Sequence, residues 1–134
     1  MLKLHYTEVG LYMEQTMTNP ELWLAQRVVL ALRLGQPLHL EPGRASFLLP
    51  ADLPALEQLE RELQRELSLV ITLIPVDDEL VEVSLSGTWV AESSEAHEGL
   101  FLTVMSARSE FLLYRLWQRS EAHLAALTSP VSPM

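Results

Sequence analysis

Residues 35–54, GQPLHLEPGRASFLLPADLP, separate two helical patterns of opposite character and constrain the fold more than any other stretch. The helix predicted before this stretch is apolar almost all round, whereas the helix predicted after it has one apolar and one charged face. Between them, two short apolar runs flank Pro42 and Gly43. Proline followed by glycine is typical of a type II turn, because glycine alone accepts the required positive φ without cost. The segment therefore predicts a β-hairpin held between two helices.

The first helix is predicted over residues 19–34. Asn19 is a suitable N-cap, Pro20 suits the first helical position, and Gly35 can end the helix in a left-handed conformation. Its apolar residues cover more of the circumference than the single stripe of an ordinary surface helix. We therefore expect it to be the central helix of the fold or to form an oligomer interface as well.

The second helix is predicted over residues 52–66, with Asp52 as its N-cap. Leu56, Leu59 and Leu63 lie on one face, and glutamate, glutamine and arginine fill the other. This is the clearest amphipathic pattern in the chain, and it predicts a helix that lies on the surface of the core.

Apolar and alternating runs predict strands in most of the remaining chain. The run at 68–74 is apolar on both faces and predicts the central strand of a sheet, because such a strand is covered on both sides. Gly87 interrupts the next alternating run and predicts a bulge. The other predicted strands cover residues 2–6, 9–14, 79–86 and 100–105.

The C-terminal pattern has two interpretations. Residues 109–127 have helical spacing of apolar side chains, with Ser109 as a suitable cap, whereas residues 111–117 alone could form a strand. We predict the helix. The chain is then a single α+β domain over 1–127 with a flexible tail at 128–134. Its largely antiparallel sheet of about five to seven strands packs against three helices, 19–34, 52–66 and 109–127.

Charge and composition narrow the possible partners. The chain has 18 acidic and 9 basic residues, a net charge of −9, and no run of basic residues, so a nucleic-acid partner is not expected. It has no cysteine, which excludes thiol catalysis and disulfides and favours a cytoplasmic protein. Its most apolar run, residues 22–34, is interrupted by arginine and too short to span a bilayer, so we expect a soluble protein without membrane insertion.

No catalytic, cofactor-binding or metal site is predicted. His39 and Glu41 share a strand face, but a metal site needs three or four converging ligands and no third is evident. The acidic run at 77–79 lacks the spacing and the glycine of a calcium loop, so we interpret it as a turn. The acidic segment at 92–98 contains His97 and is interpreted as a solvated loop, with a pH-sensitive loop as the alternative.

Tryptophan and arginine are the residues that most often anchor protein interfaces. On the first helix the candidate interface residues are Trp23, Arg27 and Leu30. On the last helix they are Arg115, Trp117 and Arg119, of which the two arginines lie one helical turn apart and could bind a pair of carboxylates.

The run VVLALRLGQPLHLEPGRASFLLPADLPALEQLE, residues 28–60, resembles small uncharacterised acidic proteins of cyanobacteria. No characterised family comes with the resemblance. It implies an accessory role in a photosynthetic organism.

We expect a non-enzymatic protein–protein interaction module, such as an assembly factor, small chaperone or regulatory subunit, that forms a homodimer or joins a complex. The alternative is a small-molecule-binding domain with an apolar pocket between the first helix and the sheet. An enzyme that uses glutamate, histidine or tyrosine as acid or base is a third hypothesis, but the sequence offers no pairing of such groups.

Overall fold

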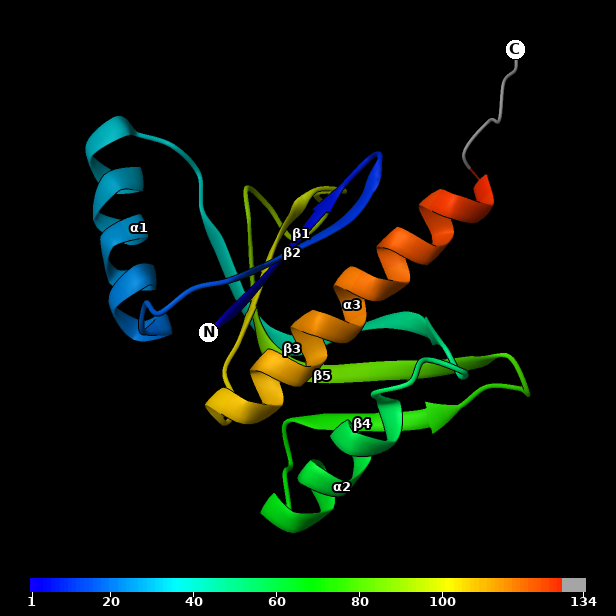
Figure 1. The fold of residues 1–134 in the computed structure, drawn as a ribbon. Helices are drawn as coiled ribbons and strands as arrows, with labels where there is room; N and C mark the ends of the chain where they lie inside the picture. The colour runs from blue at the N-terminus through cyan, green and yellow to red at the C-terminus, as the bar shows by residue number, and fades with distance from the viewer. Residues whose placement is uncertain (129–134) are drawn as a thin grey trace.

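A computed structural model describes residues 1–128, with side-chain environments through residue 120. Over this range the chain forms three helices and a six-stranded antiparallel sheet, which confirms the predicted α+β class. Of the predicted tail, 129–134 lies outside the described residues, and the single-domain organisation stays a prediction. The helices are α1 (Pro20–Leu34), α2 (Leu56–Glu66) and α3 (Ala107–Thr128), and the strands are β1 (Leu2–Thr7), β2 (Gly10–Gln15), β3 (His39–Pro50), β4 (Ile71–Pro75), β5 (Leu80–Ala91) and β6 (Gly99–Thr103) (Figure 1).

The strand β5 organises the sheet, whose order is β2-β1-β6-β5-β3. On one side β5 pairs with β3 along its whole length; on the other, its first half pairs with β4 and its second half with β6. The prediction that 68–74 is the central strand is wrong, because β4 pairs only with β5 among the described strands. Ile71 is buried but Ile74 is half exposed, so β4 is not covered on both faces as a central strand would be.

The predicted hairpin at 35–54 is also wrong. The strand β3 runs without a turn through Pro42 and Gly43, which pair with Thr88 and Gly87 of β5. A long ladder to β5 replaces the local turn, and proline is tolerated because β3 lies at the edge of the sheet. The two apolar runs therefore belong to one strand.

Gly87 marks a close approach of strands and not the predicted bulge. The register between β3 and β5 continues unbroken through this residue. A Cβ atom at Gly87 would lie 2.1 Å from the carbonyl oxygen of Leu102 and 2.9 Å from the Phe101 ring. The missing side chain thus lets β6 pair with β5 just beyond Leu85, the last residue of β5 that pairs with β4.

The main core lies between one face of the sheet and the helices α2 and α3, which pack against each other. The central residues on α3 are Leu113 and Leu116, both fully buried against Leu4, Leu85 and Phe101 of the sheet. The helical interpretation of residues 109–118 is therefore confirmed, although α3 begins two residues earlier than predicted.

A polar junction joins the end of α2 to the start of α3. The Ser109 hydroxyl donates to Glu66 Oε2 at 2.9 Å, and the Ser106 hydroxyl donates to the other oxygen of the same carboxylate. Ser106, not the predicted Ser109, caps α3, because its hydroxyl accepts from the Ser109 N–H at 3.2 Å. Asp52 is not the cap of α2, which begins after Ala55 without a side-chain cap.

Glu62 is held in its charged form at the same junction. A hydrogen bond from Arg65 is the main cause that lowers the pKa of Glu62, and the charges of Arg65 and Arg108 add to it. The Arg108 Nε donates to Glu62 Oε2 at 3.2 Å and so links α3 to α2. The carboxylate form of Glu62 therefore stabilises the helix pair.

This lowered pKa predicts an acid-sensitive contribution to folding. The unfolded-state pKa of glutamate is about 4.3, so the stabilisation is fully present above that pH and is lost as the pH falls through the lowered pKa. We expect Glu62→Gln to lower the urea midpoint at pH 7, and the difference from wild type to stay constant down to about pH 4.3 and to shrink below that pH. Urea titrations monitored by circular dichroism at matched pH values measure this difference.

Glu110 shifts in the opposite direction, because burial raises its pKa despite the nearby Met1 amino group. Glu110 is present in both wild type and Glu62→Gln, so its contribution cancels when the stabilities of the two proteins are subtracted at each pH. A difference that stays constant from pH 7 to pH 3 would contradict the role of the Glu62 carboxylate.

Candidate functional site

The helix α1 forms as the sequence predicts at both ends. The Asn19 side chain accepts from the backbone N–H groups of Glu21, at 2.7 Å, and Leu22, at 3.4 Å. Gly35 ends the helix with a φ of 63° in the left-handed region. Local signals alone therefore define the limits of α1, but they do not determine what it packs against.

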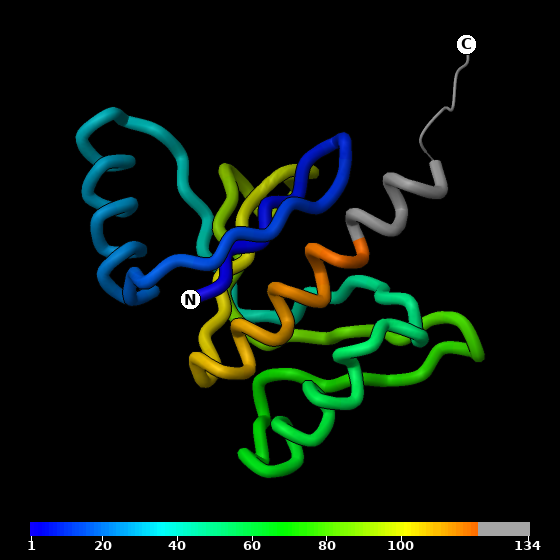
Figure 2. The backbone as a smooth tube through the Cα atoms, in the orientation of Figure 1, coloured from blue at the N-terminus to red at the C-terminus, as the bar shows by residue number. Residues whose placement is uncertain are grey.

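Although α1 is apolar, none of its 15 residues is buried. It lies apart from α2 and α3, on the opposite side of the sheet (Figures 1 and 2). Trp23 and Leu24 pack on a small cluster formed by Met1, Val90 and Leu102, away from the main core. None of the helices within residues 1–128 is long and apolar enough to cross a membrane. The helix α1 is thus not the central helix of the fold, which was one of the two expectations.

The outward side of α1 carries a regular apolar stripe. Leu22, Ala25, Val29 and Leu32 follow one another at spacings of three, four and three residues, which is the heptad spacing of packed helices. Leu22 is 55% exposed, Val29 48% and Leu32 77%. A shallow hollow of about 470 Å³ lies beside this stripe, bordered by Ala25, Gln26, Val29, Leu30 and Arg33. The stripe therefore offers both apolar ridges and a hole to a facing helix.

The charge of α1 differs from that of the chain. Of the 18 acidic residues only Glu21 lies on α1, in its first turn. The helix also carries two basic residues, Arg27 and Arg33. Two arginines against one glutamate leave the helix with a net charge of +1 on a chain of net charge −9. Hence α1 is a weakly basic, apolar element of an acidic protein.

The predicted interface residues occupy three different environments. Trp23, Arg27 and Leu30 lie together on α1, with the Arg27 guanidinium 5.8 Å from the centre of the Trp23 ring. Trp117 is buried in the main core. Arg115 and Arg119 are exposed on α3, with Arg115 above the Phe111 ring at 5.9 Å. Sequence reasoning missed the outward stripe, which the three-four-three spacing of Leu22, Ala25, Val29 and Leu32 could have revealed.

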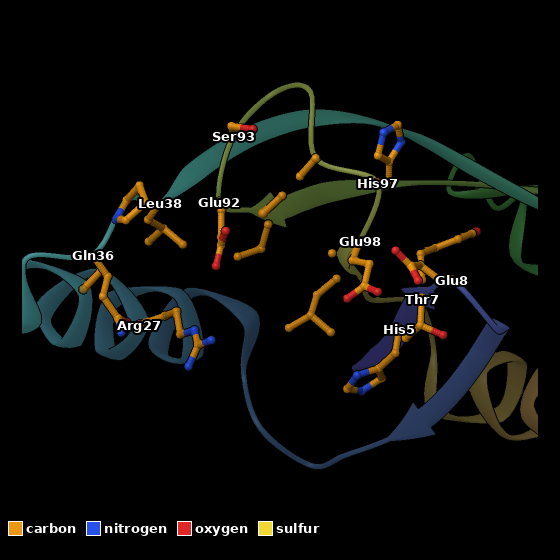
Figure 3. A pocket seen from close by; sticks show the side chains of 18 of the residues that line it. His5, Thr7, Glu8, Arg27, Gln36, Leu38, Glu92, Ser93, His97 and Glu98 are labelled. Atoms are coloured by element: carbon orange, nitrogen blue, oxygen red, sulfur yellow. The ribbon is translucent and has the colours of Figure 1, made fainter.

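A cleft of about 870 Å³ separates α1 from the sheet. Its walls come from α1, the segment that follows α1, the end of β1 and the loop between β5 and β6 (Figure 3). It lies where the alternative hypothesis expected a pocket; ligand binding itself stays a prediction. The residues that line it are His5, Tyr6, Thr7, Glu8, Arg27, Leu30, Ala31, Gln36, Pro37, Leu38, Val90, Ala91, Glu92, Ser93, Ala96, His97, Glu98, Gly99 and Leu100.

Charged side chains reach the cleft from opposite walls. Arg27 extends from α1, while Glu92 and Glu98 extend from the β5–β6 loop toward the same open space (Figure 3). Among residues 1–120, none of these three side chains forms an ion pair. His97 borders the cleft but points away from its centre in this view. The cleft therefore combines apolar walls with unpaired charges of both signs.

The other polar groupings have structural explanations. The His39 ring lies 3.2 Å from Glu41 as a pair at the sheet edge, and residues 1–120 contain no group of three or more side chains arranged to hold a metal ion. Asp77 Oδ1 accepts from the N–H groups of Glu79, at 2.7 Å, and Leu80, at 2.9 Å, which makes residues 77–79 a turn as predicted.

The comparison with protein families assigns the chain to a family. The Alr0857-like family model, named after an Anabaena open reading frame, matches residues 1–121, so the chain belongs to the Alr0857-like family. This agrees with the predicted resemblance to cyanobacterial proteins. No curated protein and no solved structure matches the chain.

Proposed function

We propose that this member of the Alr0857-like family is a self-associating interaction module whose contact surface is the apolar stripe of α1. One observation carries the proposal: a leucine- and valine-rich helix of 15 residues leaves every residue at least partly exposed. Exposed apolar patches of this kind mark interaction surfaces in soluble proteins. Covering Leu22, Val29 and Leu32 would remove apolar surface from water, which is the main driving force of association.

The heptad spacing favours a helix as the partner. Residues spaced three and four apart form the seam along which two α-helices interdigitate. A second copy offers the same stripe, so a two-fold axis would bring two identical seams together. The hollow beside Ala25 and Val29 could then receive a side chain from the facing helix.

Charge also favours a second copy on this face. Two chains of net charge −9 repel each other over most of their surfaces. Contact through α1, which carries a single carboxylate and a net charge of +1, keeps this repulsion small. We further propose a cytoplasmic location, which the absence of cysteine favours, and a role without catalysis.

The test is the oligomeric state of Val29→Glu/Leu32→Glu. We expect the wild-type protein to have twice the 15.2 kDa chain mass by light scattering at micromolar concentrations, and the variant to have the mass of one chain. The introduced carboxylates would face each other across the two-fold axis, which should weaken association at least about a hundredfold. Analytical ultracentrifugation over a range of concentrations measures the change in dissociation constant.

A matched control places two glutamates on exposed apolar positions away from α1. Leu69 is 90% exposed and Val76 55%, so Leu69→Glu/Val76→Glu adds the same charge to another surface. This control should stay associated. A wild-type protein that remains a monomer at about 100 µM, or a control that dissociates as fully as the α1 variant, would overturn the proposal.

A further inference from the structure

We infer that the cleft between α1 and the sheet binds a small apolar zwitterion, the chemical class of short apolar peptides with free termini. The inference does not rest on self-association, because the cleft uses the inward side of α1. Arg27 and Ala31 face the cleft, whereas Val29 and Leu32 lie on the other side of the helix.

The size and walls of the cleft suit a ligand of this kind. Small-molecule sites usually enclose about 300–1,000 Å³, and this cleft has a volume of about 870 Å³. Leu30 and Ala31 of α1 line it, as do Val90 and Leu100 of the sheet, and Leu38 lies at the end near Gln36 (Figure 3). The helix wall and the sheet wall of the cleft therefore both carry apolar side chains.

Arg27 provides a binding group for a carboxylate. The guanidinium carbon lies 5.8 Å from the centre of the Trp23 ring, a cation–π contact that requires none of its N–H donors. The guanidinium N–H donors match a carboxylate in a two-bond arrangement. Arg27 forms no ion pair within residues 1–120, so its guanidinium is available to pair with a ligand carboxylate.

Glu98 and Glu8 provide a binding group for an ammonium at the other end. They come from the β5–β6 loop and the β1–β2 turn, and both line the cleft near His5 (Figure 3). Neither forms an ion pair among the described side chains, whereas the His5 ring is directed to Glu14 at 3.3 Å. An ammonium at this end would find a carboxylate partner in Glu98 or Glu8.

A ligand with both charges fits better than one with a single charge. A simple anion is repelled by the net charge of −9 and by Glu92, which lies on the loop wall opposite Arg27 (Figure 3). A simple cation leaves Arg27 unpaired. A neutral zwitterion with an apolar body satisfies Arg27 and Glu98 together and also covers the apolar walls.

The test uses leucyl-phenylalanine and the tri- and tetrapeptides made by adding leucine residues. These peptides separate their termini by about 7–14 Å, at about 3.5 Å per residue. Isothermal titration calorimetry on the full chain compares each peptide with its C-terminal amide and with its des-amino form. At least one free peptide should bind with millimolar or tighter affinity, and removal of either charge should weaken binding about tenfold or more.

Variants then assign each end of the ligand. Arg27→Gln should weaken the free peptide to the level of its amide without changing the affinity for the amide. Glu98→Gln should weaken binding of the free peptide to the level of its des-amino form, without changing the affinity for the des-amino form. Glu92→Gln should strengthen binding of the free peptide. Arg33→Gln, which removes a charge outside the cleft, is the control. The inference would be overturned if no peptide bound at about 5 mM. It would also be overturned if Arg27→Gln weakened the binding of the free, amide and des-amino peptides by equal factors.

Discussion

Replacing Gly87 with alanine is expected to destabilise the fold by about 3 kcal/mol, because the added methyl group has no space between two strands. The new Cβ would lie 2.1 Å from the Leu102 carbonyl oxygen, a backbone atom that cannot move aside by rotation of a side chain. The strands β5 and β6 would have to separate. That movement would also disturb the nearby hydrogen bond in which the Thr103 hydroxyl donates to the Ser86 carbonyl at 2.8 Å.

Gly43→Ala is the matched control, because Gly43 is the register partner of Gly87 on β3. Its Cβ would meet only the Trp89 side chain, at 3.1 Å, and a side chain can shift by a few tenths of an ångström. We expect a loss below about 1 kcal/mol. Urea unfolding at one protein concentration compares the two variants, since association would add to stability. If Gly87→Ala and Gly43→Ala lost equal amounts of unfolding free energy, the pairing of β6 with β5 would not require the close approach at Gly87.

Replacing Leu113 with alanine is expected to cost about 2–5 kcal/mol of the free energy of unfolding. Leu113 is fully buried in the main core between α3 and the sheet, so its truncation removes apolar contacts and leaves a cavity. Domains of this size have only about 5–15 kcal/mol of stability, so the variant should unfold at a much lower urea concentration.

The corresponding change on α1 should have little effect on folding. Leu32 is 77% exposed, and Leu32→Ala should change the unfolding free energy by less than about 0.5 kcal/mol in dilute protein. Hydrogen exchange should likewise be faster in α1 than in α3, because α1 has no buried residue. If Leu32→Ala were as costly as Leu113→Ala, α1 would be part of the folding core, contrary to its packing.

The predicted features that are confirmed depend on local chemistry or on periodicity. The caps at Asn19 and Gly35 act within one helical turn, and the amphipathic pattern of α2 buries Leu56 and Leu59 as expected. The wrong predictions concern residues whose partners are distant in the sequence. Pro42 and Gly43 form no turn because they pair with Thr88 and Gly87, more than 40 positions away.

The candidate sites were only partly accessible to sequence reasoning. The excess apolar surface of the first helix pointed to that element, but Trp23 and Arg27 turn inward toward the small cluster or the cleft, and Leu30 borders both the cleft and the outward hollow. The outward stripe could be identified only once the inward side of α1 was known. The cleft combines four separate segments, and no spacing in the sequence indicates that Glu98 and Arg27 share it.

The sequence by itself determined the α+β class, the limits of α1 and the acidic, cysteine-free character of the chain. These properties follow from composition, from hydrophobic periodicity and from caps that act over a few residues. Only the tertiary structure decided that β5 is the central strand, that β3 passes straight through Pro42, and that α1 stands on the far side of the sheet. The reason is physical: strand pairing and burial depend on contacts between distant residues, and those contacts outweigh local preference.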